Sequence, residues 1–333
     1  MTNEYDRFNS WKVLIHSDKL KTLANTLKDP NNPIGDLPYP INWHIYPSNI
    51  CPYKCNFCIM TEEKKNKGML DKNILQKAIN DAARLKIDLI HFSGGGEPLT
   101  NPFLSEIIEY AKMRGVKTAL STNGYLLNKL NSQVDHLRIS FNAGTRELYK
   151  AIHGVDAFDK VIENIKTAVK QRKGKDIGMG FVITPENYKD IDNFIKVAEE
   201  CNVDFVHIRP AFLPDKDKII RDIVKEIKPH SEKIKVFSVS DKFKGYWDEN
   251  RYPCRATPLH AVLSATGEFM ICQDIFQKFG NYYTQSFEEI WFSKEHYDTI
   301  KKVQGCKIRC VECRQNEIIE EFFIKNSVRC ELI

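Results

Sequence analysis

Six short apolar segments alternate with amphipathic segments between residues 43 and 210, and this alternation limits the fold more than any other feature of the chain. Short runs of apolar, β-branched or aromatic residues predict strands, and apolar residues spaced three or four apart predict helices. Strands that alternate with helices form a parallel sheet in an α/β fold. Six units, without the two that would close a ring, predict a partial (β/α)6 TIM-like barrel. The expected strands are 43–48, 89–92, 116–121, 137–141, 178–183 and 205–208.

The helices between these strands carry recognisable ends. Asp71 can cap the first of them, and Gly115 can end the second. Two further helices are expected over 158–170 and 187–200. The predicted organisation is an N-terminal extension at 1–42, the barrel at 43–210, a charged connecting region at 211–250 and a small C-terminal domain at 251–333.

Ten cysteines, with no secretory signal and no apolar run of membrane-spanning length, predict a cytoplasmic protein whose thiols bind metal. Cys51, Cys55 and Cys58 have the spacing C-x3-C-x2-C. Three thiolates this close can hold three irons of a 4Fe–4S cube and leave the fourth iron open for a chelating cofactor. A zinc site is the alternative, but it needs a fourth close ligand. His44 is nearby and is expected to lie in the core or to face the substrate.

The cysteine loop follows the first predicted strand, at the face where parallel barrels carry their active sites. Phe57 is the aromatic residue beside the last cysteine, and Ser93-Gly94-Gly95-Gly96-Glu97-Pro98 follows the second strand. In these features the chain resembles the radical S-adenosylmethionine (SAM) superfamily over residues 43 to 210. The resemblance implies that a reduced cluster cleaves SAM to methionine and a 5′-deoxyadenosyl radical, which abstracts a hydrogen atom from the substrate.

The resemblance also implies which residues bind SAM. Phe57 is expected near the adenine, and the glycine run with Glu97 is expected to hold the methionine amino group. Asn142 stands where the family usually has an acidic residue, and Arg209 is expected to bind either an anionic substrate or the SAM carboxylate. The segment around His153 fits the family and is expected to be structural. The complete predicted set is Phe57, Gly94, Gly95, Gly96, Glu97, Ser121, Asn123, Ser140, Asn142 and Arg209.

A second group of cysteines lies near the C-terminus. Cys254 and Cys272 flank Gly267, which suits a hairpin that brings both thiols to one cluster. Cys310 and Cys313 add a C-x2-C pair, and four thiolates suffice for one auxiliary 4Fe–4S cluster. Over residues 251 to 315 the arrangement resembles the twitch subtype of SPASM-like domains, with one auxiliary cluster. Other possibilities are that Cys306 or Cys330 replaces a ligand, or that the site is a zinc staple; the remaining cysteine, Cys201, is expected in the core.

The charge pattern narrows the partners. The 333 residues carry a net charge of +5, with Lys and Arg spread among Asp and Glu, so no basic block indicates nucleic acid or a membrane surface. A small-molecule substrate is expected, together with a reducing partner such as flavodoxin or ferredoxin.

The resemblance implies an oxidoreductase. The auxiliary cluster would accept an electron in a net oxidation of a sugar-like or aminocyclitol-like substrate. Asp274, two residues after Cys272, is the candidate base for the substrate hydroxyl, and the alternative is a solvated aspartate in a turn. An epimerase would instead use a cysteine such as Cys306 as hydrogen donor. Modification of a ribosomally made peptide is a further alternative, although only about 43 residues precede the barrel. A non-enzymatic iron–sulfur carrier is the third class, and the Gly94–Pro98 motif disfavours it.

Overall fold

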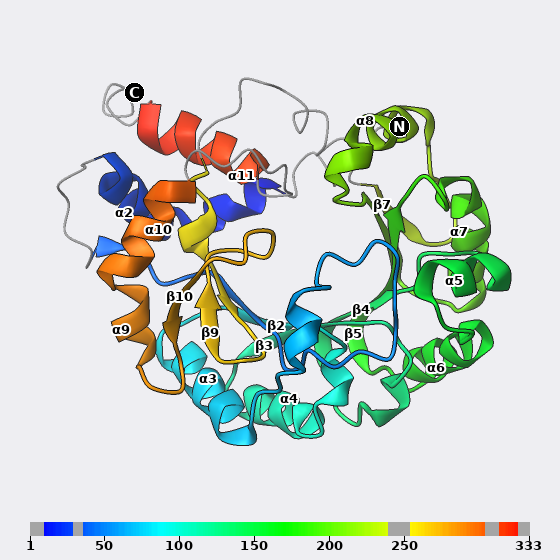
Figure 1. The fold of residues 1–333 in the computed structure, drawn as a ribbon, viewed down its shortest axis with the longest axis horizontal. Coiled ribbons are helices and arrows are strands. Elements are labelled where there is room, and N and C mark those ends of the chain that lie inside the picture. The colour runs from blue at the N-terminus through cyan, green and yellow to red at the C-terminus, as the bar shows by residue number, and fades with distance from the viewer. Residues whose placement is uncertain (1–9, 29–35, 239–253, 304–312, 326–333) are drawn as a thin grey trace.

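One ten-stranded sheet organises the protein. The computed structural model describes residues 10–28, 36–238, 254–303 and 313–325. In this part the strand order is β10-β9-β8-β1-β2-β3-β4-β5-β6-β7. The strands form an open curve, with helices along its outer side (Figure 1). This arrangement confirms the predicted α/β class and partial barrel.

All six predicted strands are present and pair in parallel in chain order. The strands are β1 (Asn42–Ile45), β2 (Leu89–Phe92), β3 (Lys117–Thr122), β4 (Val134–Ser140), β5 (Gly174–Ile183), β6 (Phe205–Pro210), β7 (Lys235–Ser238), β8 (His260–Leu263), β9 (Glu268–Met270) and β10 (Lys278–Asn281).

The helices pack on the outer side of the sheet and near the chain ends. Asp71 caps α3 as predicted, because its side chain accepts a hydrogen bond from the Ile74 N–H. The α-helices are α2 (Ser17–Lys28), α3 (Lys72–Arg84), α4 (Leu104–Met113), α5 (Arg146–His153), α6 (Phe158–Lys170), α7 (Ile191–Glu200), α8 (Asp217–Glu226), α9 (Phe287–Trp291), α10 (Lys294–Val303) and α11 (Cys313–Ile318). A π-helix, η10 (Ile319–Lys325), continues α11.

The prediction that the alternation ends at Pro210 is wrong. Helix α8 follows β6, and β7 then pairs in parallel with β6, so the region predicted as a connection adds a seventh strand. Two features explain why the sequence did not predict α8 and β7. The apolar residues Ile220, Ile223 and Val224 of α8 lie within a charged helix. The edge strand β7 is only half-buried and therefore lacks a clear apolar run.

The C-terminal segment joins the same sheet. Strand β8 pairs in parallel with β1, with Asn42 opposite His260 and Ile45 opposite Leu263. Strands β8 and β9 form the predicted hairpin, and Gly267 at its turn has φ +82°, in the left-handed region that glycine adopts without strain. A Cβ at Gly267 would also lie 2.3 Å from the Tyr283 ring. The auxiliary cysteines are thereby attached to the first strand of the barrel.

An aromatic cluster fixes this attachment. The fully buried Trp43 of β1 lies 5.5 Å from Phe269, 5.5 Å from Tyr282 and 4.9 Å from Phe287, measured between ring centroids. Aromatic pairs at such distances add to the free energy gained by burial. The contact joins the strand before the cysteine loop to the C-terminal hairpin and α9.

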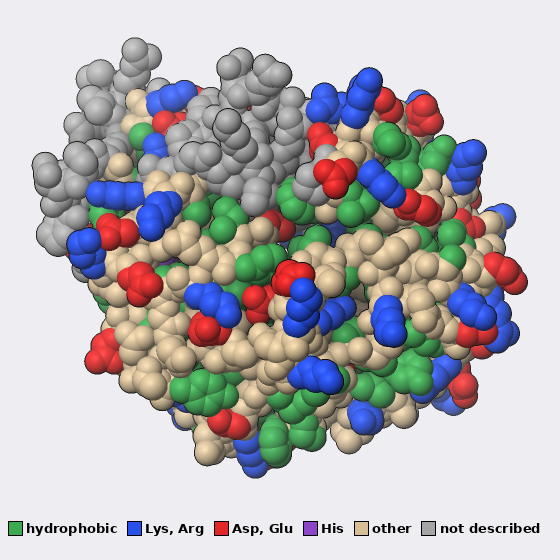
Figure 2. Space-filling model, in the orientation of Figure 1, with side chains coloured by type: hydrophobic (Ala, Val, Ile, Leu, Met, Phe, Trp, Pro, Cys, Tyr) green, Lys and Arg blue, Asp and Glu red, His purple; other side chains and the backbone are tan. Residues whose placement is uncertain are grey.

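The protein surface carries a mixture of positive and negative side chains. Lys and Arg side chains alternate with Asp and Glu over the face that Figure 2 shows. None of the helices in the described ranges is both long and apolar enough to cross a membrane.

Replacing Trp43 tests the attachment. We expect Trp43→Ala to lower the free energy of unfolding by about 3–5 kcal/mol, because it leaves a cavity among three aromatic rings. Trp43→Phe should cost less, since the indole N–H makes no hydrogen bond. Chemical denaturation measures both, with the exposed Met113→Ala as control. Equal stability of Trp43→Ala and the control would contradict the attachment.

Candidate active site

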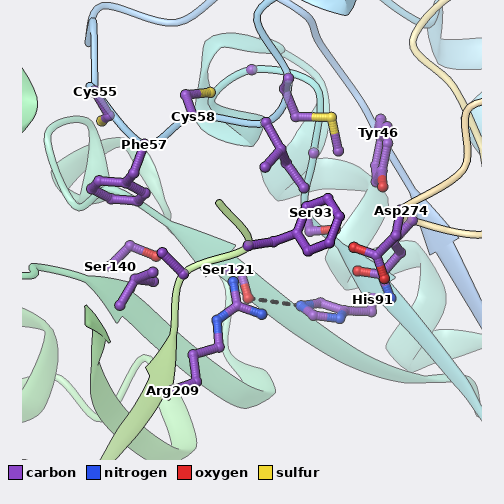
Figure 3. A pocket seen from close by; sticks show the side chains of 18 of the residues that line it. Tyr46, Cys55, Phe57, Cys58, His91, Ser93, Ser121, Ser140, Arg209 and Asp274 are labelled. Carbon is purple, nitrogen blue, oxygen red and sulfur yellow. Dashed lines mark hydrogen bonds between the residues drawn. The ribbon is translucent and has the colours of Figure 1, made fainter. Parts of the chain in front are cut away.

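A cavity of about 360 Å³ opens at the carboxyl ends of the barrel strands, where active sites of such barrels lie. Residues from both ends of the chain line it (Figure 3). The predicted residues among them are Cys51, Cys55, Phe57, Cys58, Gly94, Gly96, Glu97, Ser121, Asn123, Ser140, Asn142, Arg209, Cys254, Cys272 and Asp274. Gly95 does not line the cavity. Cys306, Cys310 and Cys330 lie outside the described residues, as does the side chain of Cys313.

The glycine run holds the cysteine loop in place. The Gly96 N–H donates to Ser48 O and the Glu97 N–H to Ile50 O, both at 2.8 Å. A Cβ at Gly96 would lie 2.4 Å from Ile50 O, and one at Gly95 would lie 1.8 Å from the amide oxygen of Asn49. The two segments therefore approach as closely as backbone allows, immediately before Cys51.

Glu97 joins the glycine run to the end of β3. Its carboxylate is buried, with Oε1 accepting from Thr122 Oγ1 at 2.6 Å and Oε2 from the Asn123 N–H at 2.8 Å. Oε1 also accepts from the Leu99 N–H at 3.1 Å. Burial raises the pKa of Glu97, and these hydrogen bonds partly offset that rise. Glu97 thus positions the loop that carries Asn123.

Each thiol of the cysteine loop has a polar partner from elsewhere in the chain. Lys64 Nζ donates to Cys58 Sγ at 3.0 Å, and Asn123 Nδ2 lies 3.8 Å from Cys51 Sγ. His153 Nε2 donates to Phe141 O at 2.8 Å, which leaves Nδ1 facing Cys55 Sγ at 3.1 Å. Burial lowers the pKa of His153 to about 4, so the ring is neutral. The His153 segment, predicted to be structural, also contacts a thiol.

These thiols suit a cationic cluster. Burial, together with the neighbouring Cys51 and Cys58, raises the pKa of the Cys55 thiol to about 12. Burial likewise raises the pKa of Cys51. Three crowded thiols become thiolates only beside a strong positive charge, which iron supplies. In the described part of the chain no three His, Cys, Asp or Glu side chains converge on one metal ion. A cube does not need such convergence, because each thiolate binds a different iron.

The second pair of thiols faces the same cavity. Cys254 is close enough to Cys272 to raise its pKa, but burial is the main cause of that rise, to about 12. The amide oxygen of Asn316 on α11 accepts from the backbone N–H groups of Arg255 and Ala256, at 2.7 and 2.8 Å. The C-terminal helix thus fixes the backbone immediately after Cys254.

Asn142 and Asp274 take different positions in the site. Asn142 has φ +61°, and its amide oxygen accepts from the Val182 N–H at 2.8 Å, so its side chain holds β4 to β5. Asp274 lies beside Tyr46 and His91 at the cavity wall (Figure 3). Burial and the nearby Asp274 raise the pKa of Tyr46.

Comparison with known proteins decides the family. Residues 45–198 match the radical SAM superfamily, and residues 254–315 match SPASM, an iron–sulfur cluster-binding domain. The chain belongs to the radical SAM superfamily. It is a SPASM/twitch-type radical SAM enzyme, and its family uses SAM, a 4Fe–4S cluster and auxiliary iron–sulfur clusters. The domain limits, the single auxiliary cluster and the site residues stay predictions.

Several relatives give the degree of similarity. A probable GTP 3′,8-cyclase of Saccharolobus islandicus (strain L.S.2.15 / Lassen #1) is 30% identical over 218 residues, which are 61% of this chain and 67% of that protein. One of Sulfurisphaera tokodaii is 33% identical over 165 residues, 48% of this chain and 52% of that protein. Streptococcus suis SuiB bound to precursor peptide SuiA has a TM-score of 0.61 at 15% identity, covering 96% of this chain and 88% of that chain. AnSMEcpe with bound AdoMet has a TM-score of 0.59 at 15% identity, covering 85% and 96%.

Sequence reasoning did not assign Lys64 or Arg138 to this site, and it expected only a structural role for the His153 segment. Lys64 is one of several lysines after the cysteine motif, and no pattern distinguishes it. His153 lies 98 residues from Cys55 in the chain. Arg138 lies two residues before Ser140, so strand periodicity could have placed it on the same face.

Gly96→Ala tests the fit between the glycine run and the cysteine loop. We expect loss of the iron bound at Cys51, Cys55 and Cys58 after anaerobic reconstitution, with the auxiliary iron retained, because the new Cβ would displace the backbone before Cys51. Gly180→Ala is the control, since its Cβ would meet nothing closer than 3.6 Å. Iron per chain is the measurement, and full loading of the Gly96 variant would contradict the assignment.

Lys64→Met tests the partner of Cys58. Burial lowers the pKa of Lys64, but its contacts with Cys58 and the other thiols raise it more, so the side chain stays cationic. A cation and hydrogen bond at a ligating sulfur stabilise the more negative, reduced cluster. We therefore expect Lys64→Met to lower the midpoint potential, measured by EPR-monitored titration. Lys65→Met, which removes an exposed pair with Glu62, should leave that potential unchanged; equal potentials in both variants would refute this role for Lys64.

Proposed function

We propose that this radical SAM enzyme oxidises a small polar substrate, of sugar or aminocyclitol type, by two electrons. One observation carries the proposal. Cys51, Cys55 and Cys58 line the same cavity as Cys254 and Cys272. A substrate in that cavity would lie between the two sets of thiols, within reach of both.

The proposed chemistry follows from that placement. Bound at Cys51, Cys55 and Cys58, the reduced cluster and SAM supply a radical that takes a hydrogen atom from a carbinol carbon, and a cluster at Cys254 and Cys272 supplies the acceptor for the remaining electron. The hydroxyl proton must also leave. The C–H and O–H bonds of the carbinol then break, and the second C–O bond of the carbonyl forms. The chain has to provide a base for this proton.

Asp274 is the proposed base. It follows Cys272 by two residues and lines the cavity beside Tyr46. A carboxylate within hydrogen-bond reach of the substrate hydroxyl can accept its proton as the carbonyl forms. The cavity also buries the reacting groups, which limits the loss of radicals to water.

A nucleotide is the second candidate substrate. The 30% identity to a probable GTP 3′,8-cyclase favours it, although the matched part is 61% of this chain. Epimerisation with Cys306 as hydrogen donor is distinguished by its product, because only an oxidation leaves the product two electrons poorer. Peptide modification is distinguished by the substrate that transfers deuterium to 5′-deoxyadenosine. We further propose a cytoplasmic location, with flavodoxin or ferredoxin as reductant.

Deuterium transfer tests the proposal. Anaerobically reconstituted, reduced enzyme should release 5′-deoxyadenosine from SAM and incorporate deuterium from a labelled sugar or aminocyclitol. Asp274→Asn should reduce formation of the carbonyl product about 10²-fold or more, the range for loss of a general base. It should still release 5′-deoxyadenosine.

Two controls complete this experiment. Cys272→Ala should also uncouple SAM cleavage from oxidation, whereas Asp215→Asn, an exposed carboxylate, should behave as wild type. Deuterium transfer from GTP alone would support the nucleotide instead. Absence of 5′-deoxyadenosine from fully loaded enzyme would refute the proposal.

A further inference from the structure

The floor of the cavity is unusually rich in basic side chains. His91 of β2, Arg138 of β4 and Arg209 of β6 all line it. Ser121 of β3 is paired in register with Arg138, and its hydroxyl lies 2.8 Å from His91 Nε2 (Figure 3) and 3.0 Å from Arg138 Nη2. These contacts fix the Arg138 guanidinium within the barrel.

Strand β5 leaves room for this arginine. Gly178 is the partner of Arg138 in register, and Gly180 is the partner of His207. Ideal Cβ geometry at Gly180 would place that atom 3.6 Å from Arg138 Cδ, so the arginine stem lies over Gly180. The guanidinium thereby spans β5, with Nη1 3.4 Å from His207 Nδ1 on β6.

The charge of Arg138 has no counter-charge in the described part of the chain. Its hydrogen-bond partners, Ser121 and His207, are not carboxylates, and it forms no ion pair there. Burial, and then the like charge of Arg209, lower the pKa of Arg138 to about 9. Arg138 is half-buried, and a cation withdrawn from water without a carboxylate partner costs folding free energy, so such a group usually has another role.

The carboxylates of the cavity are engaged elsewhere. Glu97 accepts three hydrogen bonds from the segment 99–123. Asp274 lies at the cavity wall beside Tyr46 and His91. Neither carboxylate is among the charges that act on Arg138. The charge of Arg138 is therefore not balanced by the carboxylates of the cavity.

The guanidinium also has unused donors. Arginine carries five N–H groups, and two contacts account for two of them. The planar arrangement of the rest matches the oxygens of a carboxylate or phosphate. Arg138 precedes Ser140 by two residues, so it lies about 7 Å deeper along β4 than that predicted SAM contact, at the level of Ser121.

We propose that Arg138 binds an anionic group, a carboxylate or a phosphate, of the substrate. This inference rests on the proposed function, because it assumes that the substrate occupies this cavity. It narrows the substrate to an anionic small molecule whose charged end lies on the floor and whose reacting carbon faces the two sets of thiols.

Anion binding to the reconstituted enzyme tests the inference. Inorganic phosphate and acetate are compared with chloride at equal ionic strength, with and without saturating SAM, by the midpoint of thermal unfolding. We expect phosphate or acetate to raise the midpoint in wild type, and the more effective anion identifies the group. Arg138→Met should lower the affinity for that anion about tenfold or more, as expected for loss of a hydrogen bond to a charged group. Arg146→Met, an exposed arginine paired with Asp156, should bind as wild type does.

A second readout separates binding from a structural role. Without added anion, Arg138→Met should unfold at a higher temperature than wild type, because a buried charge is replaced by an apolar side chain of similar length. A lower midpoint together with unchanged anion binding would make Arg138 a structural residue and overturn the inference.

The remaining outcomes are equally decisive. An equal shift in chloride, or a shift that SAM abolishes, would overturn the inference; the latter would assign Arg138 to the SAM carboxylate. Release of 5′-deoxyadenosine is measured on the same samples. Normal release without anion binding refutes only this inference, whereas no release in fully loaded enzyme refutes the proposed function itself.

Discussion

The parallel pairing of β1 with β8 is the constraint on which the site depends. Strand β1 leads into the cysteine loop, and the β8–β9 hairpin connects Cys254 to Cys272. One row of backbone hydrogen bonds therefore brings both sets of thiols to one cavity. The aromatic cluster around Trp43 fixes that row, because its rings come from β1, from β9 and from the segment after β9.

Close backbone contact also holds the cysteine loop in place inside the barrel. Gly95 and Gly96 let the loop after β2 lie against the residues before Cys51, where any side chain would collide. Glu97 then fixes the loop after β3 through its hydrogen bonds with Thr122 and Asn123. The glycine run and Glu97, predicted to bind SAM, thus also support the cysteine loop.

Charge is distributed unevenly in the cavity. The thiols of Cys51 and Cys55 have raised pKa values and ionise when metal binds, whereas Arg138 is a half-buried cation that forms no ion pair with a described carboxylate. Asp274 and Cys272 line the same cavity. A bound species of opposite charge stabilises groups of this kind, which is how binding sites commonly differ from a packed core.

The sequence by itself determined the cysteine loop, the glycine run and the six-strand alternation, because each is local and its spacing carries the chemistry. It also indicated the hairpin around Gly267. Only the tertiary structure added the strand β7 and the joining of β8 to β1, since an edge strand and a short parallel pairing leave no periodic signal. Contacts such as His153 with Cys55, or Arg138 with His207, link residues 98 and 69 positions apart. His153 meets Cys55 because the end of α5 lies against the cysteine loop, where the Lys54 N–H donates to His153 O. Arg138 meets His207 because the barrel turns alternate residues of its strands inward, which spacing along the chain does not specify.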